Sequence, residues 1–154
     1  LFWEPLDLDQ ASERLAERLA RTSLAGEGDI LSLAIEERST GDFVGEVIAI
    51  YQSEANSHVE IGYTVAPRVA GRGYATEAAA ALLEAVFSEM AAHRVTAELD
   101  AANIASARVL DKLGMRREAH HRAAQVVKGR WVDTLVYAML SDEFLASRRN
   151  SRAD

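Results

Sequence analysis

Residues 68–77 carry the strongest structural signal in this sequence. They read Arg-Val-Ala-Gly-Arg-Gly-Tyr-Ala-Thr-Glu and lie between a predicted strand at residues 58–65 and a predicted helix that begins at Tyr74. Gly71 and Gly73 allow the backbone to turn tightly and to approach a ligand closely. The start of the helix adds unpaired N–H groups and the positive end of the helix dipole. The segment therefore predicts an anion site, and phosphate is the expected ligand.

Two well-known phosphate loops do not fit this segment. A Walker loop ends in Gly-Lys-Ser or Gly-Lys-Thr, whereas this chain has Gly73-Tyr74-Ala75. A Rossmann fingerprint requires a third glycine, and Thr76 occupies that position. The alternative interpretation is an ordinary strand-to-helix turn whose arginines increase solubility.

The spacing Arg68-x-x-Gly71-x-Gly73 resembles the pyrophosphate loop of the GCN5-related N-acetyltransferases (GNAT), which bind acetyl-coenzyme A. Residues 100–115 resemble the later helix of that family. Residues 128–137 resemble the final strand of its RimJ/RimL branch, which acetylates the N-termini of ribosomal proteins. The three segments occur in the family's order. The resemblance implies an acetyl-CoA-dependent N-acetyltransferase that transfers acetyl to a primary amine, such as a protein N-terminal α-amine, directly in a ternary complex.

Composition sets wider limits. A length of 154 residues and an apolar fraction of 49% predict one domain, residues 1–154, with a substantial core. A net charge of −7 argues against nucleic acid as the main partner and weakly favours a cationic acceptor. The absence of cysteine excludes an acyl-cysteine route within these residues. No apolar run approaches the roughly 18 residues of a membrane span, and no signal peptide is visible, so we expect no membrane partner and a cytoplasmic protein.

The two ends of the chain carry separate expectations. The chain begins Leu1-Phe2-Trp3 without Met. Members of the resembled branch open with a strand and a helix before this point, so we expect a further N-terminal segment that completes one edge of the substrate pocket. The polar residues 147–154 predict a frayed tail.

The predicted elements alternate between helices and strands. They comprise a helix at 9–22, a hairpin at 30–37 and 43–51, a strand at 58–65, a helix at 74–91, a strand at 94–99, a helix at 103–113, and strands at 115–118 and 132–140. This order predicts an α+β fold in which helices cover a mixed, mostly antiparallel sheet as an α/β/α sandwich. The resemblance implies the GNAT fold, in which strands 58–65 and 94–99 splay apart and admit the coenzyme.

The resemblance also implies which residues hold the coenzyme. Backbone N–H groups of the loop would face the pyrophosphate, with the arginines adding charge, and the backbone of residues 61–65 would pair with the pantetheine arm. Asn103 would contact the same arm, or it caps the following helix. The coenzyme residues expected in this way are Ile61, Tyr63, Val65, Arg68, Val69, Ala70, Gly71, Arg72, Gly73, Tyr74, Ala75, Thr76, Asn103 and Ser106.

An acceptor amine must be neutral before it attacks, so a general base is expected. Glu60 is the first candidate, acting through a water, although it could instead orient the substrate or face solvent. Glu46 on the neighbouring strand is the second candidate. His120 and His121 could titrate near neutral pH. Adjacent strand residues point in opposite directions, so at most one histidine would face the pocket.

The departing thiolate requires a hydrogen-bond or proton donor. Many relatives carry Tyr seven residues after the Asn, but this chain has Leu110 there. Ser106 lies one helical turn after Asn103 and is our candidate, unless it only satisfies a helix N–H group. The missing Tyr keeps a non-catalytic acyl-CoA sensor as an alternative. A small-molecule acetyltransferase acting on a polyamine, amino acid or aminoglycoside is another.

Acceptor recognition is assigned to Glu46, Asp133 and Tyr137. Asp133 and Tyr137 share a face of the last predicted strand, where Asp133 could pair with a cationic amine or cap a loop. Three aromatic residues could line a pocket or fill the core: Trp3, Tyr51 and Trp131. No metal is expected, because the four histidines lack ligand-like spacing with acidic residues. The resemblance to this branch also suggests a homodimer, although no feature of the sequence itself indicates one.

Overall fold

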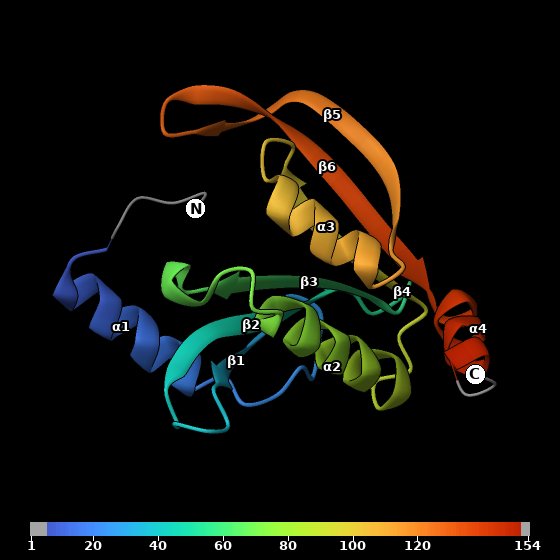
Figure 1. The fold of residues 1–154 in the computed structure, drawn as a ribbon, viewed down its shortest axis with the longest axis horizontal. Helices are drawn as coiled ribbons and strands as arrows, with labels where there is room; N and C mark the ends of the chain where they lie inside the picture. Colours follow the sequence, from blue (N-terminus) through green and yellow to red (C-terminus); the bar gives the residue numbers. More distant parts are fainter. Residues whose placement is uncertain (1–5, 152–154) are drawn as a thin grey trace.

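The computed structural model describes residues 6–151, which form a six-stranded sheet with helices on both faces (Figure 1). The helices are α1 (Leu8–Leu19), α2 (Tyr74–Ser88), α3 (Ile104–Lys112) and α4 (Ser141–Ser151), and η1 (Pro67–Val69) is a short 3-10 turn. The strands are β1 (Ile30–Glu36), β2 (Phe43–Ser53), β3 (His58–Val65), β4 (Arg94–Asp100), β5 (Arg116–Val127) and β6 (Arg130–Leu140).

The sheet has the order β1-β2-β3-β4-β6-β5, and only the β3–β4 pair is parallel. This confirms the predicted mixed, mostly antiparallel sheet of the α+β class. Helices α2 and α3 cover one face (Figure 1). Val47 of β2 packs into the core beneath α2, so its neighbour Glu46 faces the other side, where it pairs with Arg18 of α1.

Alternation along the strands explains the position of the core. Val59, Val95 and Leu99 are buried, and each is flanked by polar or exposed residues. On α2, Leu82, Leu83 and Val86 recur at helical spacing and bury against this face. Burial of each such side chain contributes roughly 1.5–3 kcal/mol to folding. The core thereby holds α2 and α3 rigidly beside the central strands.

Strands β3 and β4 separate along their length. They pair at three positions, His58–Arg94, Val59–Val95 and Glu60–Thr96, and the pairing ends there. The rest of β3 remains paired with β2, and the rest of β4 remains paired with β6. The predicted splay is therefore present, and within residues 6–151 no strand pairs with residues 61–65 on the β4 side.

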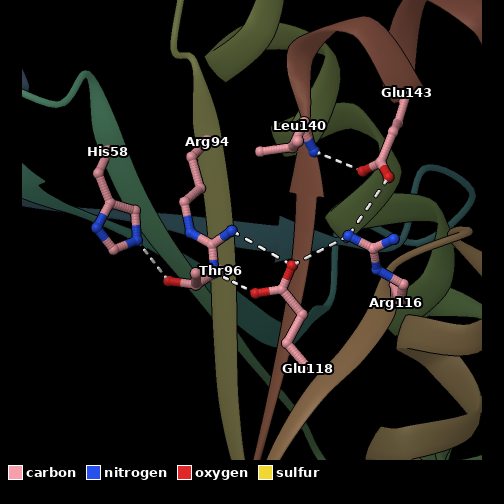
Figure 2. Close-up of polar contacts among 7 residues, drawn as sticks. All are labelled: His58, Arg94, Thr96, Arg116, Glu118, Leu140 and Glu143. Atoms are coloured by element: carbon pink, nitrogen blue, oxygen red, sulfur yellow. Dashed lines mark hydrogen bonds and ion pairs between the residues drawn. The ribbon is translucent and has the colours of Figure 1, made fainter.

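The closed end of β3 and β4 is tied together by polar side chains (Figure 2). Glu118 of β5 accepts hydrogen bonds from Arg94 at 2.5 Å and from Arg116 at 3.4 Å. Arg116 also lies 3.8 Å from Glu143 of α4, and His58 bonds Thr96 at 2.8 Å. Together these contacts join β3 to β4, and join β4, β5 and α4, at the end opposite the splay.

The predicted extent of one strand was wrong. Strand β5 has 12 residues rather than the four expected at 115–118, and it continues to a turn at Lys128 and Gly129, whose φ angles are 50° and 73°. Most of β5 is exposed, so its sequence lacks the alternation that marks a half-buried strand. Within the described part of the chain, no helix is long and apolar enough to cross a membrane.

Helix α4 was not expected, and it includes residues 147–151 of the polar segment that was predicted to fray. Glu143 accepts a hydrogen bond from the Leu140 N–H at 2.9 Å, which satisfies a donor at the helix start. Phe144 stacks on Phe87 of α2 with ring centroids 4.7 Å apart. Tertiary packing therefore stabilises this polar helix. Residues 1–5, including Trp3, and residues 152–154 lie outside the described part.

Candidate functional site

The loop from Pro67 to Gly73 leads from the splayed end of β3 into α2. Pro67 opens the 3-10 turn, and Val69 anchors it with only 4% of its surface exposed. Gly71 and Gly73 have φ angles of 79° and 93°, a conformation that favours glycine. A Cβ atom added at either glycine would meet nothing within 4 Å. Both positions therefore require glycine for its backbone conformation, and the space beside them is open.

This loop presents a run of free backbone donors. The N–H groups of Gly71, Gly73, Tyr74, Ala75 and Thr76 have no hydrogen-bond partner among residues 6–151. The cap residue Gly73 has no side chain to satisfy them. Clustered N–H groups at a helix start favour an anion through their partial charges and the helix dipole. The local chemistry therefore suits a phosphate or pyrophosphate group.

Both loop arginines are used to hold the loop. Arg68 donates to the carbonyl oxygen of Phe43 at 2.6 Å, and Arg72 pairs with Glu37 at 3.1 Å. The Tyr74 hydroxyl donates to the same Glu37 oxygen at 2.6 Å, and this bond raises the pKa of Tyr74. Glu37 was missed by the sequence analysis, because its role depends on a contact with residues 35 and 37 positions away. The backbone is thus left as the free anion donor of this loop.

A pair of hydroxyl groups joins β3 to α3 beside the splay. The Tyr63 hydroxyl donates to the Ser106 carbonyl oxygen at 3.0 Å, and Ser106 Oγ donates to the Tyr63 hydroxyl oxygen at 3.0 Å. Burial raises the pKa of Tyr63, and the hydrogen bond from Ser106 opposes the rise. The sequence analysis expected Tyr63 to contribute only backbone contacts and missed its hydroxyl.

Asn103 is the N-cap of α3. Its Oδ1 accepts a hydrogen bond from the Ser106 N–H at 3.1 Å. This is the capping role left open by the sequence, and it orients the first turn that carries Ser106. Leu110, where many relatives have Tyr, is only 1% exposed and packs in the core. It supplies no proton to the site.

Glu60 lies at the last position where β3 pairs with β4. By strand alternation, its side chain is on the face opposite Tyr63. Its Oε2 accepts a hydrogen bond from Gln52 at 2.6 Å. Burial raises the pKa of Glu60, the Glu98 carboxylate raises it further, and the bond from Gln52 opposes both. A carboxylate tuned in this direction is better suited to accept a proton near neutral pH.

The three predicted acceptor residues do not converge. Glu46 shares the Glu60 face and is held by Arg18 and by Ser32, at 2.9 Å for the serine. Asp133 and Tyr137 are on the other face, and Tyr137 is only 4% exposed. Burial, followed by the charge of Asp111, raises the pKa of Tyr137.

Asp133 is already occupied within the β5–β6 hairpin. It accepts a hydrogen bond from the Ala123 N–H at 2.9 Å and lies 2.7 Å from His120. The bond from Ala123, followed by that from His120, lowers the pKa of Asp133. His121 pairs with Thr134 and so has the opposite orientation. Trp131 is 69% exposed on this hairpin, whereas Tyr51 packs against the core.

A cavity of about 590 Å³ lies between β1 and α2. Its walls include Leu33, Val47 and Leu82, and it borders the loop through Tyr74. Neither Glu60 nor the Tyr63–Ser106 pair lines it, so the cavity is separate from the groups suited to acid–base chemistry. Among the residues described, no group of three or more histidine or acidic side chains is arranged to hold a metal ion.

The sequence is similar to those of known acetyltransferases. The profile of the acetyltransferase (GNAT) domain matches residues 2–116. The chain is 39% identical over 97 residues to the uncharacterized N-acetyltransferase YnaD of Bacillus subtilis (strain 168), covering 63% of this chain and 57% of YnaD. The chain thus spans little more than half the length of that relative.

Solved structures give a consistent fold. An acetyltransferase (GNAT family) from Bacillus anthracis superimposes with a TM-score of 0.77 at 26% identity, covering 90% of this chain and 77% of that one. A mutant form of the spermidine N-acetyltransferase SpeG from Vibrio cholerae also gives a TM-score of 0.77, at 18% identity, covering 96% of this chain and 84% of that one. At that identity, the second likeness concerns the fold alone.

Proposed function

The chain belongs to the GNAT acetyltransferase family, and from this premise we propose that it is an acetyl-CoA-dependent N-acetyltransferase. The observation that carries the proposal is the run of free N–H groups at Gly71, Gly73, Tyr74, Ala75 and Thr76, placed at the mouth of the β3–β4 splay. An ordinary strand-to-helix turn has no need of two glycines at positive φ beside open space.

The coenzyme would bind along the opened strand. The free N–H groups of the loop suit the pyrophosphate, with Val69 and Ala70 shaping the turn before them. The β3 backbone from Ile61 to Val65 has unpaired groups on the β4 side that suit the amides of the pantetheine arm. Asn103 and Ser106, at the start of α3, are the residues proposed to border the coenzyme on the side away from β3.

Acetyl transfer would take place directly between the two bound substrates. Glu60 is the proposed general base, acting through water from the face opposite Tyr63. Ser106, in the first turn of α3, is the proposed polar residue beside the departing sulfur. Because these residues include no cysteine, an acyl-cysteine intermediate is excluded within them. The acceptor is a primary amine, and we propose a protein N-terminal α-amine, whose ordinary pKa near 8 requires only a weak base.

A small-molecule amine is the competing acceptor, since SpeG, which shares the fold, is named for spermidine. Coenzyme A release from acetyl-CoA, followed by thiol detection, separates these cases. The amines would be peptides with free N-termini, spermidine, amino acids and an aminoglycoside. Release that depends on peptides alone supports the proposed acceptor, and release with spermidine alone replaces it. Tight acetyl-CoA binding without release from any amine would instead favour the sensor function.

A further inference from the structure

We propose that the Tyr63 hydroxyl is the proton donor to the leaving sulfur, and that Ser106 positions it. The inference rests on the proposed function and names the acid that the missing Tyr at position 110 would otherwise supply. It also revises the role of Ser106, which acts through Tyr63 rather than on the sulfur itself.

The position of Tyr63 supports this role. It lies three residues beyond Glu60, on the part of β3 that has separated from β4. Its side chain reaches the first turn of α3, 43 residues away in sequence, and is half-buried there. The reciprocal 3.0 Å contacts with Ser106 therefore place a phenol between the two elements that border the opening.

The direction of the hydrogen bonds separates the two roles. Ser106 Oγ donates to the Tyr63 oxygen, which stabilises negative charge on that oxygen when its proton leaves. A phenol, with an ordinary pKa of about 10, is also a far stronger acid than an aliphatic hydroxyl. Burial keeps the pKa of Tyr63 raised, so the hydroxyl remains protonated at neutral pH.

The proton and electron balance is complete with the two substrates and water. The Tyr63 proton, which the Ser106 carbonyl oxygen accepts in the structure, turns toward the sulfur when the coenzyme is bound. As the thioester C–S bond breaks, its electron pair passes to sulfur and this proton forms the S–H bond. Glu60 takes, through water, the proton that the amine loses as the new C–N bond forms, and releases it to solvent. The Tyr63 phenolate recovers one proton from solvent, so the two transfers balance. Tyr63 ends the cycle protonated.

A test that needs no acceptor uses the thiol of bound coenzyme A. A hydrogen bond from Tyr63 to sulfur favours the thiolate, so Tyr63→Phe should raise the pKa of the bound thiol by about one. The thiolate is followed by its ultraviolet absorbance, with the desulfo-coenzyme A complex as the blank that removes tyrosine ionisation. Tyr51→Phe is the matched control, because Tyr51 packs against the core away from α3.

The outcomes separate this inference from the proposed function. An unchanged thiol pKa in Tyr63→Phe, with coenzyme A bound as tightly as in the wild type, would overturn the inference alone. Failure of the wild type to bind coenzyme A would remove the proposed function and the inference with it. A shift in Tyr63→Phe that is absent in Tyr51→Phe supports the assignment.

The same variants make a kinetic prediction with the amine that supports release. Tyr63→Phe should lower kcat by about 100-fold while the KM for acetyl-CoA changes little. Ser106→Ala should lower kcat by about 10-fold, since one supporting hydrogen bond is lost. If both act through one proton, the double variant should be no slower than Tyr63→Phe. Multiplicative losses would assign Ser106 an independent role and contradict the inference.

Discussion

Arg68 donates a 2.6 Å hydrogen bond to the carbonyl oxygen of Phe43, so the first arginine of the loop is directed at the protein's own backbone. We expect Arg68→Gln, which keeps a donor but loses the charge, to bind acetyl-CoA within about 2-fold of the wild type. Arg68→Ala should weaken binding by about 5- to 10-fold, the loss of one hydrogen bond to a charged group. Calorimetry at two salt concentrations measures both.

The exposed hairpin residue Arg130 provides the control for charge alone. Arg130→Ala should leave acetyl-CoA affinity unchanged. If Arg68→Gln binds as poorly as Arg68→Ala and the affinity of both loses its dependence on salt, Arg68 instead contacts a phosphate directly.

The backbone conformation of Gly73 leads to a second prediction, about the affinity of this loop for acetyl-CoA. Its φ of 93° would strain an alanine by roughly 1–2 kcal/mol. Relief of that strain would reorient the neighbouring N–H groups, so Gly73→Ala should weaken acetyl-CoA binding by at least about 10-fold. Gly28 has a φ of 90° and equally open space, yet lies before β1, so Gly28→Ala is the matched control. Equal affinities for the two variants would contradict the assignment of the loop.

The sequence predicted this loop well because local residues determine it. Pro67 ends β3, and two glycines separate it from the helical spacing of α2. Both elements begin where the sequence indicated. The Arg68–Phe43 bond and the Tyr63–Ser106 pair join residues 25 and 43 positions apart. No local pattern marks such contacts, so the sequence could not indicate which donor atoms of the candidate site remain free.

Strand β5 and helix α4 were predicted poorly because local sequence only partly determines them. Strand β5 is an edge strand whose side chains are exposed on both faces, so burial imposes no alternation on its sequence. Helix α4 does carry local signals, with Asp142 and Glu143 in its first turn and Arg148 and Arg149 in its last. Those charges could have indicated the helix, whereas its packing through Phe144 could not be inferred.

Glu60 predicts a dependence of rate on pH. Because its pKa is raised, kcat/KM should fall as the pH drops through a value above that of an ordinary glutamate. Glu98→Gln removes a charge that raises this pKa, so the acidic limb should move to lower pH. Gln52→Leu removes a bond that lowers the pKa, so the limb should move to higher pH. Glu60→Gln should abolish this limb, leave only the dependence set by the pKa of the acceptor amine, and reduce the rate by about 100-fold. If the acidic limb of the kcat/KM profile stays at the same pH in these variants, the general base is a residue other than Glu60.

Glu118 predicts how stability depends on pH. The hydrogen bond from Arg94 lowers the pKa of Glu118 in the folded protein. A lowered carboxylate pKa contributes stability that is present above the unfolded value, near 4.5, and is lost as the pH falls through the folded value. Because the side chains remain partly exposed, Glu118→Gln should cost only about 0.5–1 kcal/mol at pH 7, a decrease of about 1–4 °C in Tm.

The difference between wild type and Glu118→Gln should shrink as the pH falls from the unfolded value through the lowered folded value, because Glu118 then becomes neutral like the glutamine. Glu17→Gln, an exposed change on α1, is the control and should leave Tm within about 1 °C at every pH. Calorimetric unfolding from pH 3 to pH 8 measures the three proteins together. A difference that persists undiminished at pH 3 would show that Glu118 stabilises the closed end of β3 and β4 by packing, and that its charge is irrelevant.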